Sequence, residues 1–198
     1  MFTRSPHLAN VLSRSVDPAA LPFLDSCFNL ALLHGGESEW DFSRAPDASY
    51  NPLPARVALI LINDARITRA EILATAMIAS VCLKEEDLLT LRSFTEFKHV
   101  CALLNLVEQY PSCTMENSEI ERDIASIVAA LWLDRARHIH LTPHQDKITI
   151  WEDFSEMITP IARDTTGARG NLHLLLSTWL ERFSLRLEQK KATAFPQK

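Results

Sequence analysis

The stretch EIERDIASIVAALWLDRARH, residues 119–138, predicts a long amphipathic helix. At about 100° per residue, its apolar stripe, which spans roughly 60° of arc, consists of four aliphatic side chains: Ile120, Ile124, Ile127 and Leu131. Asp134 continues the same line, and His138 follows it. A charged carboxylate buried there alone would cost on the order of several kcal/mol. The pattern therefore predicts a partner for Asp134: a metal ion, an arginine or a hydrogen-bond network.

Composition indicates an ordinary soluble globular chain of 198 residues, with 47% hydrophobic and 23% charged residues. The formal charge of −5 offers no general attraction for nucleic acid or for an anionic membrane. The four glycines build no phosphate-binding loop, and the four cysteines form no C-x-x-C pair, which suits a reducing compartment. No apolar run has the length of a signal peptide or a membrane span. We therefore expect a cytoplasmic, single-domain protein that binds neither nucleic acid nor membrane.

Helix start and stop signals recur along the whole chain and predict an all-α, single-domain helical bundle. Residues 1–16 are expected to form a loose leader, residues 17–189 the helical domain, and residues 190–198 a frayed tail. Asp17-Pro18 and a capping box at Thr68–Glu71 are typical helix starts. The predicted helices are 17–33, 55–63, 68–83, 85–110, 119–141, 151–163 and 171–189, with a long loop at 37–54 and an alternating segment at 147–151 that could be extended.

Four segments in order along the chain resemble motifs of a known family. The segment ALLHGG (31–36) is similar to A-x-A-H-x-G-Q, and SYNPLPARVALIL (49–61) is similar to Y-I-x-H-P-x-x-V-A-x-I-L. The segment ILATAMIASV (72–81) is similar to L-x-A-A-L-L-H-D-V, and LWLDRARH (131–138) is similar to K-L-A-D-R-L-H-N. This series resembles the HD-domain metal phosphohydrolases, most closely the hydrolase domain of the (p)ppGpp synthetase/hydrolase family. It covers roughly residues 20–185 and implies an HD-like bundle.

In that family two histidines, one of them in a His-Asp dipeptide, together with the aspartate of that dipeptide and a distant aspartate, hold a divalent metal that activates water and neutralises phosphate. The first histidine position falls here on Asn51 or Leu53, and the dipeptide falls on Ala79 and Ser80. Only the distant position, Asp134, is kept. Because the loss of three of four ligands leaves no coordination shell, the resemblance implies a degenerate HD domain with no catalytic residues and no metal.

The positions that remain define a candidate pocket: Asp134, Arg135, His138, Asn51 and Ser80. Asp134 would either line this pocket and bind a ligand or metal, or be a structural carboxylate tied to Arg135, a backbone amide or a neighbouring helix. His138 can meet Asp134 across one helical turn.

Two further places have a functional and a structural interpretation. His138, His140 and His144 form a histidine cluster that is either a metal site or a helix end with favourable charge. Arg163, Arg169 and Asn171 surround the turn DTTGARGN, residues 164–171, which either holds a phosphate at a helix N-terminus or is a capped, solvated turn. Trp132 falls away from the stripe of Asp134 and indicates a second buried face or a dimer contact.

The sequence leads to three functional hypotheses. The first is a non-catalytic HD-like domain that acts as a regulatory, ligand-binding or protein-interaction module. The second is a metal-dependent phosphohydrolase with a site rebuilt around Asp134 and His138, in which a divalent metal would be the cofactor. The third is a purely structural helical partner protein. The expected partners are a small phosphate-containing ligand, a second copy of the chain or another protein.

Overall fold

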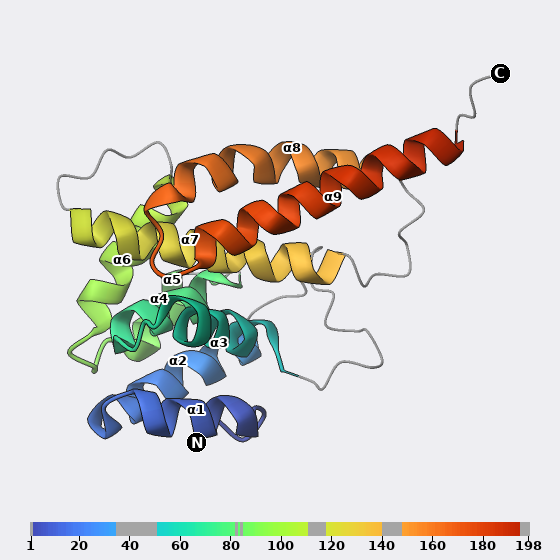
Figure 1. The fold of residues 1–198 in the computed structure, drawn as a ribbon. Helices are drawn as coiled ribbons and strands as arrows, with labels where there is room; N and C mark the ends of the chain where they lie inside the picture. The colour runs from blue at the N-terminus through green and yellow to red at the C-terminus, as the bar shows by residue number, and fades with distance from the viewer. Residues whose placement is uncertain are drawn as a thin grey trace.

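The computed structural model describes residues 2–34, 51–81, 83, 85–110, 118–139 and 148–194, and every regular element within these ranges is helical (Figure 1). The prediction of an all-α, single-domain fold is confirmed. None of the helices in these ranges is long and apolar enough to cross a membrane. The elements are α1 (Pro6–Ser15), the 3-10 turn η1 (Pro18–Ala20), α2 (Leu21–His34), α3 (Leu53–Ala65), α4 (Ala70–Ala79), α5 (Glu85–Leu88), η2 (Leu89–Leu91), α6 (Phe97–Gln109), α7 (Ser118–Ile139), α8 (Ile148–Asp164), η3 (Thr165–Gly167) and α9 (Leu172–Ala194).

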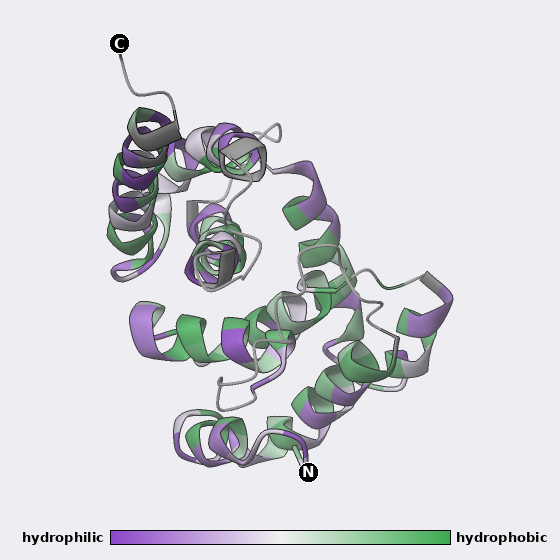
Figure 2. Ribbon diagram, turned by 90° about the vertical axis from the view of Figure 1, so that its right-hand side faces the viewer, coloured by the Kyte–Doolittle hydropathy of each residue, from purple (hydrophilic) through white to green (hydrophobic). Residues whose placement is uncertain are grey.

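Helix α7 lies between two groups of helices. On one side it contacts α3, α4 and α6; α3 packs with α1 and α2, and α4 packs with α2 and α6. On the other side it contacts α8 and α9, which pack against each other along their length (Figure 1). Figure 2 shows the same arrangement turned by 90°, with hydrophobic and hydrophilic residues alternating along most helices, as amphipathic packing requires. Any side chain on the buried faces of α7 therefore lies at a junction of the fold.

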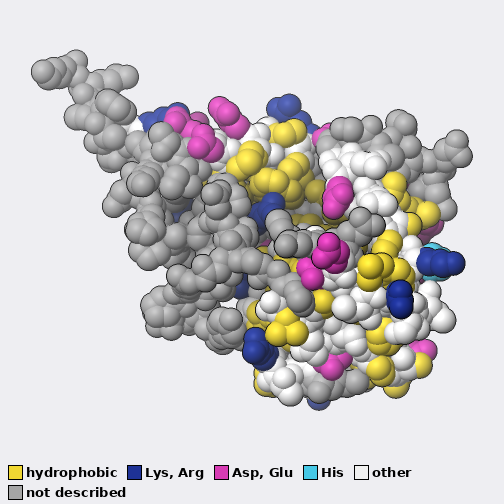
Figure 3. Space-filling view, turned by 180° about the vertical axis from the view of Figure 1, so that it is seen from behind, with side chains coloured by type: hydrophobic (Ala, Val, Ile, Leu, Met, Phe, Trp, Pro, Cys, Tyr) yellow, Lys and Arg dark blue, Asp and Glu magenta, His cyan; other side chains and the backbone are white. Residues whose placement is uncertain are grey.

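One continuous hydrophobic core links both groups, from Phe2 at the N-terminus to Phe183 in α9. Trp132 of α7 is partly buried and packs against it, with its ring centroid 5.9 Å from that of Phe154 in α8. Of the two interpretations of Trp132, the structure supports the second buried face. In the space-filling view of Figure 3, acidic and basic side chains are interspersed between hydrophobic ones on the face that is shown.

The prediction of a loose leader over residues 1–16 is wrong, because α1 is a helix packed on α3. Ser5 caps it by accepting a hydrogen bond from the Leu8 amide at 3.4 Å, and Pro6 occupies the first turn. Leu8 and Leu12 are fully buried. One apolar residue per turn is enough to hold α1 on the domain, because the neighbouring helix completes the burial of these side chains. At the other end, α9 continues to Ala194, five residues beyond the predicted boundary.

Other differences concern where helices begin and break. The capping box at Thr68 does not form: α4 begins at Ala70, and its N-cap residue Arg69 makes no capping side-chain bond, because a guanidinium has no acceptor for a backbone amide. The helix predicted over 85–110 is divided into α5, η2 and α6. At this break Phe94 packs on Phe23 of α2, with ring centroids 5.2 Å apart. The segment expected to be extended at 147–151 is helical from Ile148 onward. Most of the predicted loop, residues 35–50, lies outside the described residues.

Candidate functional site

Helix α7 presents Asp134 to the interior, as the sequence pattern predicted. Ile124 and Ile127 are fully buried, and Asp134 is 2% exposed; Ile120, in the first turn, is 37% exposed. The rotation of the helix deduced from its apolar stripe is therefore confirmed, and the burial of a carboxylate makes the identity of its partner the central question.

The partner is Arg56, which comes from α3. Its Nε donates to Oδ1 of Asp134 at 3.0 Å, and its Nη2 donates to Oδ2 at 3.0 Å. Such a bidentate pair of a planar guanidinium with a carboxylate is the strongest form of salt bridge. The third nitrogen, Nη1, donates to the backbone carbonyl oxygen of Asn51 at 3.0 Å, and the Asn51 side-chain oxygen accepts from Ser5 at 2.8 Å. One guanidinium thus joins α7, α3 and Asn51, which lies two residues before α3.

The predicted pocket residues are brought together only in part. Asp134 and Asn51 meet at Arg56, whereas the Ser80 hydroxyl is buried at the end of α4 and donates to the Met77 carbonyl at 2.7 Å. The guanidinium of Arg135 lies over the ring of Trp132, 4.9 Å from its centroid. The side chain of His138, with all of His140 and His144, lies outside the described residues.

Arg56 was not predicted as the partner of Asp134, although the sequence contains a signal for it. It is a cation flanked by fully buried Ala55 and Val57 in a helix that is apolar nearly all round, which mirrors the position of Asp134 in α7. Both carboxylate oxygens of Asp134 are engaged by this cation. In the described part of the chain, no three His, Cys, Asp or Glu side chains gather in a way that would hold a metal ion.

An open cavity of about 370 Å³ lies between α3 and α7, next to this pair. Its lining includes the apolar Leu59 and Ile60 and, besides Arg56 and Asp134, three polar residues: Asn63, Asp64 and Arg137. Nη2 of Arg137 lies 3.6 Å from Oδ2 of Asp64, and both side chains are about one third exposed. The cavity therefore contains two ion pairs: a closed pair, Arg56–Asp134, with direct hydrogen bonds, and a loose pair, Arg137–Asp64, at a longer distance.

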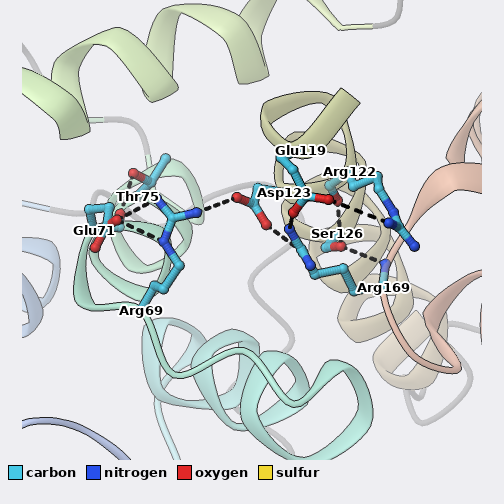
Figure 4. A network of polar contacts seen from close by, with 8 residues as sticks. All are labelled: Arg69, Glu71, Thr75, Glu119, Arg122, Asp123, Ser126 and Arg169. Carbon is cyan, nitrogen blue, oxygen red and sulfur yellow. Dashed lines mark hydrogen bonds and ion pairs between the residues drawn. The ribbon is translucent and has the colours of Figure 1, made fainter. Parts of the chain in front are cut away.

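A second buried carboxylate on α7 was not predicted. Asp123 is 2% exposed and lies between two arginines (Figure 4). Arg69 donates to its Oδ2 at 2.8 Å, and Arg169 donates from Nε to its Oδ1 at 2.6 Å. Arg69 also pairs with Glu71, and Arg169 pairs with Glu119. The hydrogen bond from Arg169 is the main reason why the pKa of Glu119 is lowered. The network joins α4, α7 and the turn before α9.

That turn, residues 164–171, is docked rather than open. The backbone amide of Arg169 donates to Ser126 of α7 at 2.8 Å, and that of Asn171 donates to the Asp64 carbonyl at 3.2 Å. Gly170 has φ +61°, and a Cβ at this position would lie 2.2 Å from the Asp64 carbonyl oxygen. Arg169 already pairs with two carboxylates. This geometry therefore supports the interpretation of the segment as a capped turn and not as a phosphate-binding site.

Two groups away from this junction have raised pKa values. Burial, with a smaller contribution from Glu96, raises the pKa of the Cys27 thiol to about 12. Burial, with smaller contributions from Asp164 and Glu121, raises the pKa of Tyr110 to about 12. Both groups therefore stay protonated at neutral pH, which makes Cys27 a core residue rather than a nucleophile.

Compared with protein-family models, with curated proteins and with solved structures, the chain shows no significant match.

Proposed function

We propose that this protein is a non-catalytic, HD-like helical domain that acts as a regulatory or interaction module. The observation that carries the proposal is the bidentate contact of Arg56 with Asp134. A carboxylate whose two oxygens are both bound to a guanidinium is a poor metal ligand and a poor general base, since either role would require it to leave a buried cation without its partner.

The resemblance to the HD phosphohydrolases supports the same conclusion. In that resemblance Asp134 falls on one position that holds the metal and either Asn51 or Leu53 falls on another; Arg56 donates to the Asp134 carboxylate and to the backbone carbonyl of Asn51. The guanidinium supplies a positive charge next to Asp134 without a coordination shell and without an activated water. What is proposed to remain is the helical framework, together with the cavity between α3 and α7.

The competing function, a phosphohydrolase rebuilt around Asp134 and His138, is tested by metal content. We would purify the wild-type chain, Asp134→Asn and the control Asp64→Asn, a carboxylate of the same cavity that has no bidentate partner. Elemental analysis after incubation with Mn²⁺, Zn²⁺ or Fe²⁺ and desalting should give far less than one ion per chain in all three. About one ion per wild-type chain, lost in Asp134→Asn and kept in Asp64→Asn, would overturn the proposal.

A further inference from the structure

The two ion pairs of the α3–α7 cavity differ in how available they are to a ligand. The side chains of Arg56 and Asp134 are 16% and 3% exposed, and all three nitrogens of Arg56 donate to the protein. Those of Arg137 and Asp64 are 34% and 29% exposed, and their 3.6 Å separation is too long for a hydrogen bond. Arg137 and Asp64 are therefore the charges that a ligand can reach.

These two groups offer one positive and one negative charge side by side, next to the small exposed parts of two aliphatic side chains. Leu59 and Ile60, which line the same cavity, are 8% and 5% exposed, and the exposed amide of Asn63 lies at its edge. Within the described residues, Asn63 makes no side-chain hydrogen bond, so its donors and acceptor remain available. An exposed ion pair contributes little to stability, so a ligand loses little by separating it.

We propose that this cavity binds a small zwitterion with an apolar side chain, that is, a free α-amino acid of the leucine type. Its carboxylate binds Arg137, its ammonium group binds Asp64, and its side chain covers Leu59 and Ile60. A volume of about 370 Å³ is sufficient for a molecule of this size. This assignment deepens the proposed function and rests on it in one respect, namely that Arg56 and Asp134 are committed to each other.

The charges of the cavity favour a zwitterion over a phosphate. The lining carries two arginines and two aspartates, so its formal charge is zero. A phosphate group with a charge near −2 would meet only one uncommitted guanidinium and would lie close to Asp64, whose carboxylate repels it. An amino acid instead finds an opposite charge for each of its own charges and gains charge-assisted hydrogen bonds at both ends.

Isothermal titration calorimetry with L-leucine on the full chain tests the proposal. We expect saturable binding, with a dissociation constant on the order of 1 mM. L-leucinamide lacks the carboxylate and N-acetyl-L-leucine lacks the ammonium group, so each should bind about tenfold more weakly. Arg137→Gln and Asp64→Asn should each weaken L-leucine binding about tenfold as well, while Arg92→Gln, an exposed arginine of another surface, should leave it unchanged.

Thermal melting of each variant first shows that it is folded, so that a loss of binding reports on the cavity. Absence of saturable binding by leucine, isoleucine, valine, methionine and phenylalanine would overturn the proposal. Binding unaffected by both cavity variants would also overturn it. Saturable binding of inorganic phosphate or AMP that Arg137→Gln abolishes would assign the cavity to phosphate instead. Metal content separates these outcomes from a failure of the proposed function, because it reports on Asp134 and not on Arg137.

Discussion

Helix α7 carries two buried carboxylates that are neutralised in different ways. Asp123 and Asp134 are both 2% exposed and lie eleven residues apart, so they are on nearly the same face of the helix. Asp134 is bound at both oxygens by the single guanidinium of Arg56. Asp123 is bound at one oxygen by Arg69 and at the other by Arg169, and each of these arginines has a second acidic partner.

The difference predicts which of the two carboxylates costs the fold more stability when an arginine partner is removed. Arg56 is 16% exposed and its carboxylate 3%, so water can replace little of what each group of this pair provides to the other. Arg69 is 57% exposed and Arg169 is 28% exposed, so water can replace part of what Asp123 provides. The Arg56–Asp134 pair places two hydrogen bonds of one guanidinium on one carboxylate, whereas the network distributes its contacts over two arginines and three carboxylates.

The largest effect is expected from Arg56→Met, which leaves Asp134 buried without its bidentate partner. Urea unfolding should show a loss of about 3–5 kcal/mol. Arg92→Met, at an exposed arginine, is the matched control and should change stability by less than about 0.5 kcal/mol. The double variant Arg56→Met/Asp134→Leu should recover most of the loss, because it removes both charges. A loss below about 1 kcal/mol for Arg56→Met would contradict the closed-pair interpretation.

The next effect is expected from Gly170→Ala, which changes the turn that brings Arg169 to Asp123. The left-handed φ and the 2.2 Å approach to the Asp64 carbonyl should together cost about 2–4 kcal/mol in urea unfolding. Gly167→Ala is the control, since a Cβ there meets only Arg122 Cγ at 4.0 Å. The effect should be additive with Arg56→Met and non-additive with Asp123→Asn. Additivity with both would show that the turn does not support the network.

Asp123→Asn should have a smaller effect than Arg56→Met, about 1–3 kcal/mol, because the amide keeps one acceptor and the two arginines stay hydrated and paired with Glu71 and Glu119. Chemical denaturation under identical conditions makes the two values comparable. If Asp123→Asn is as destabilising as Arg56→Met, the network does not distribute its energy and the comparison fails.

The smallest effect is expected from Glu119→Gln at the edge of the network, and it should depend on pH. The pKa of Glu119 is lowered in the folded chain, chiefly by its hydrogen bond from Arg169. A lowered folded-state pKa gives stability that is complete above the ordinary carboxyl value of 4.5 and is lost as the pH falls through the lowered value. The thermal midpoint of wild type should therefore exceed that of Glu119→Gln slightly at pH 7, and by a smaller margin at pH 3. An equal difference at both pH values would rule out this contact as the source.

Sequence reasoning placed Asp134 correctly because the direction of a helical side chain follows from local spacing. It did not find Arg56, which lies 78 residues earlier, because pairing two distant helices depends on tertiary packing that periodicity does not encode. Asp123 had the same local signal as Asp134, being eleven residues before it on one face, and was overlooked. The start of α1 was also readable in Ser5 and Pro6. The likeness to the HD family remains a prediction.

The spacing of the two carboxylates also bears on how the chain selects one arrangement of α7. Asp123 and Asp134 are about 16 Å apart along the axis, and their cations come from α3, from the residue before α4 and from the turn before α9. A slide of α7 by one turn would still bury aliphatic side chains, but it would separate both carboxylates from their arginines at once. Aliphatic contacts alone tolerate such a slip, whereas two charged contacts at fixed spacing do not. The two pairs together thus fix the register of α7 along its axis. A stability measurement of either pair alone would not show this role.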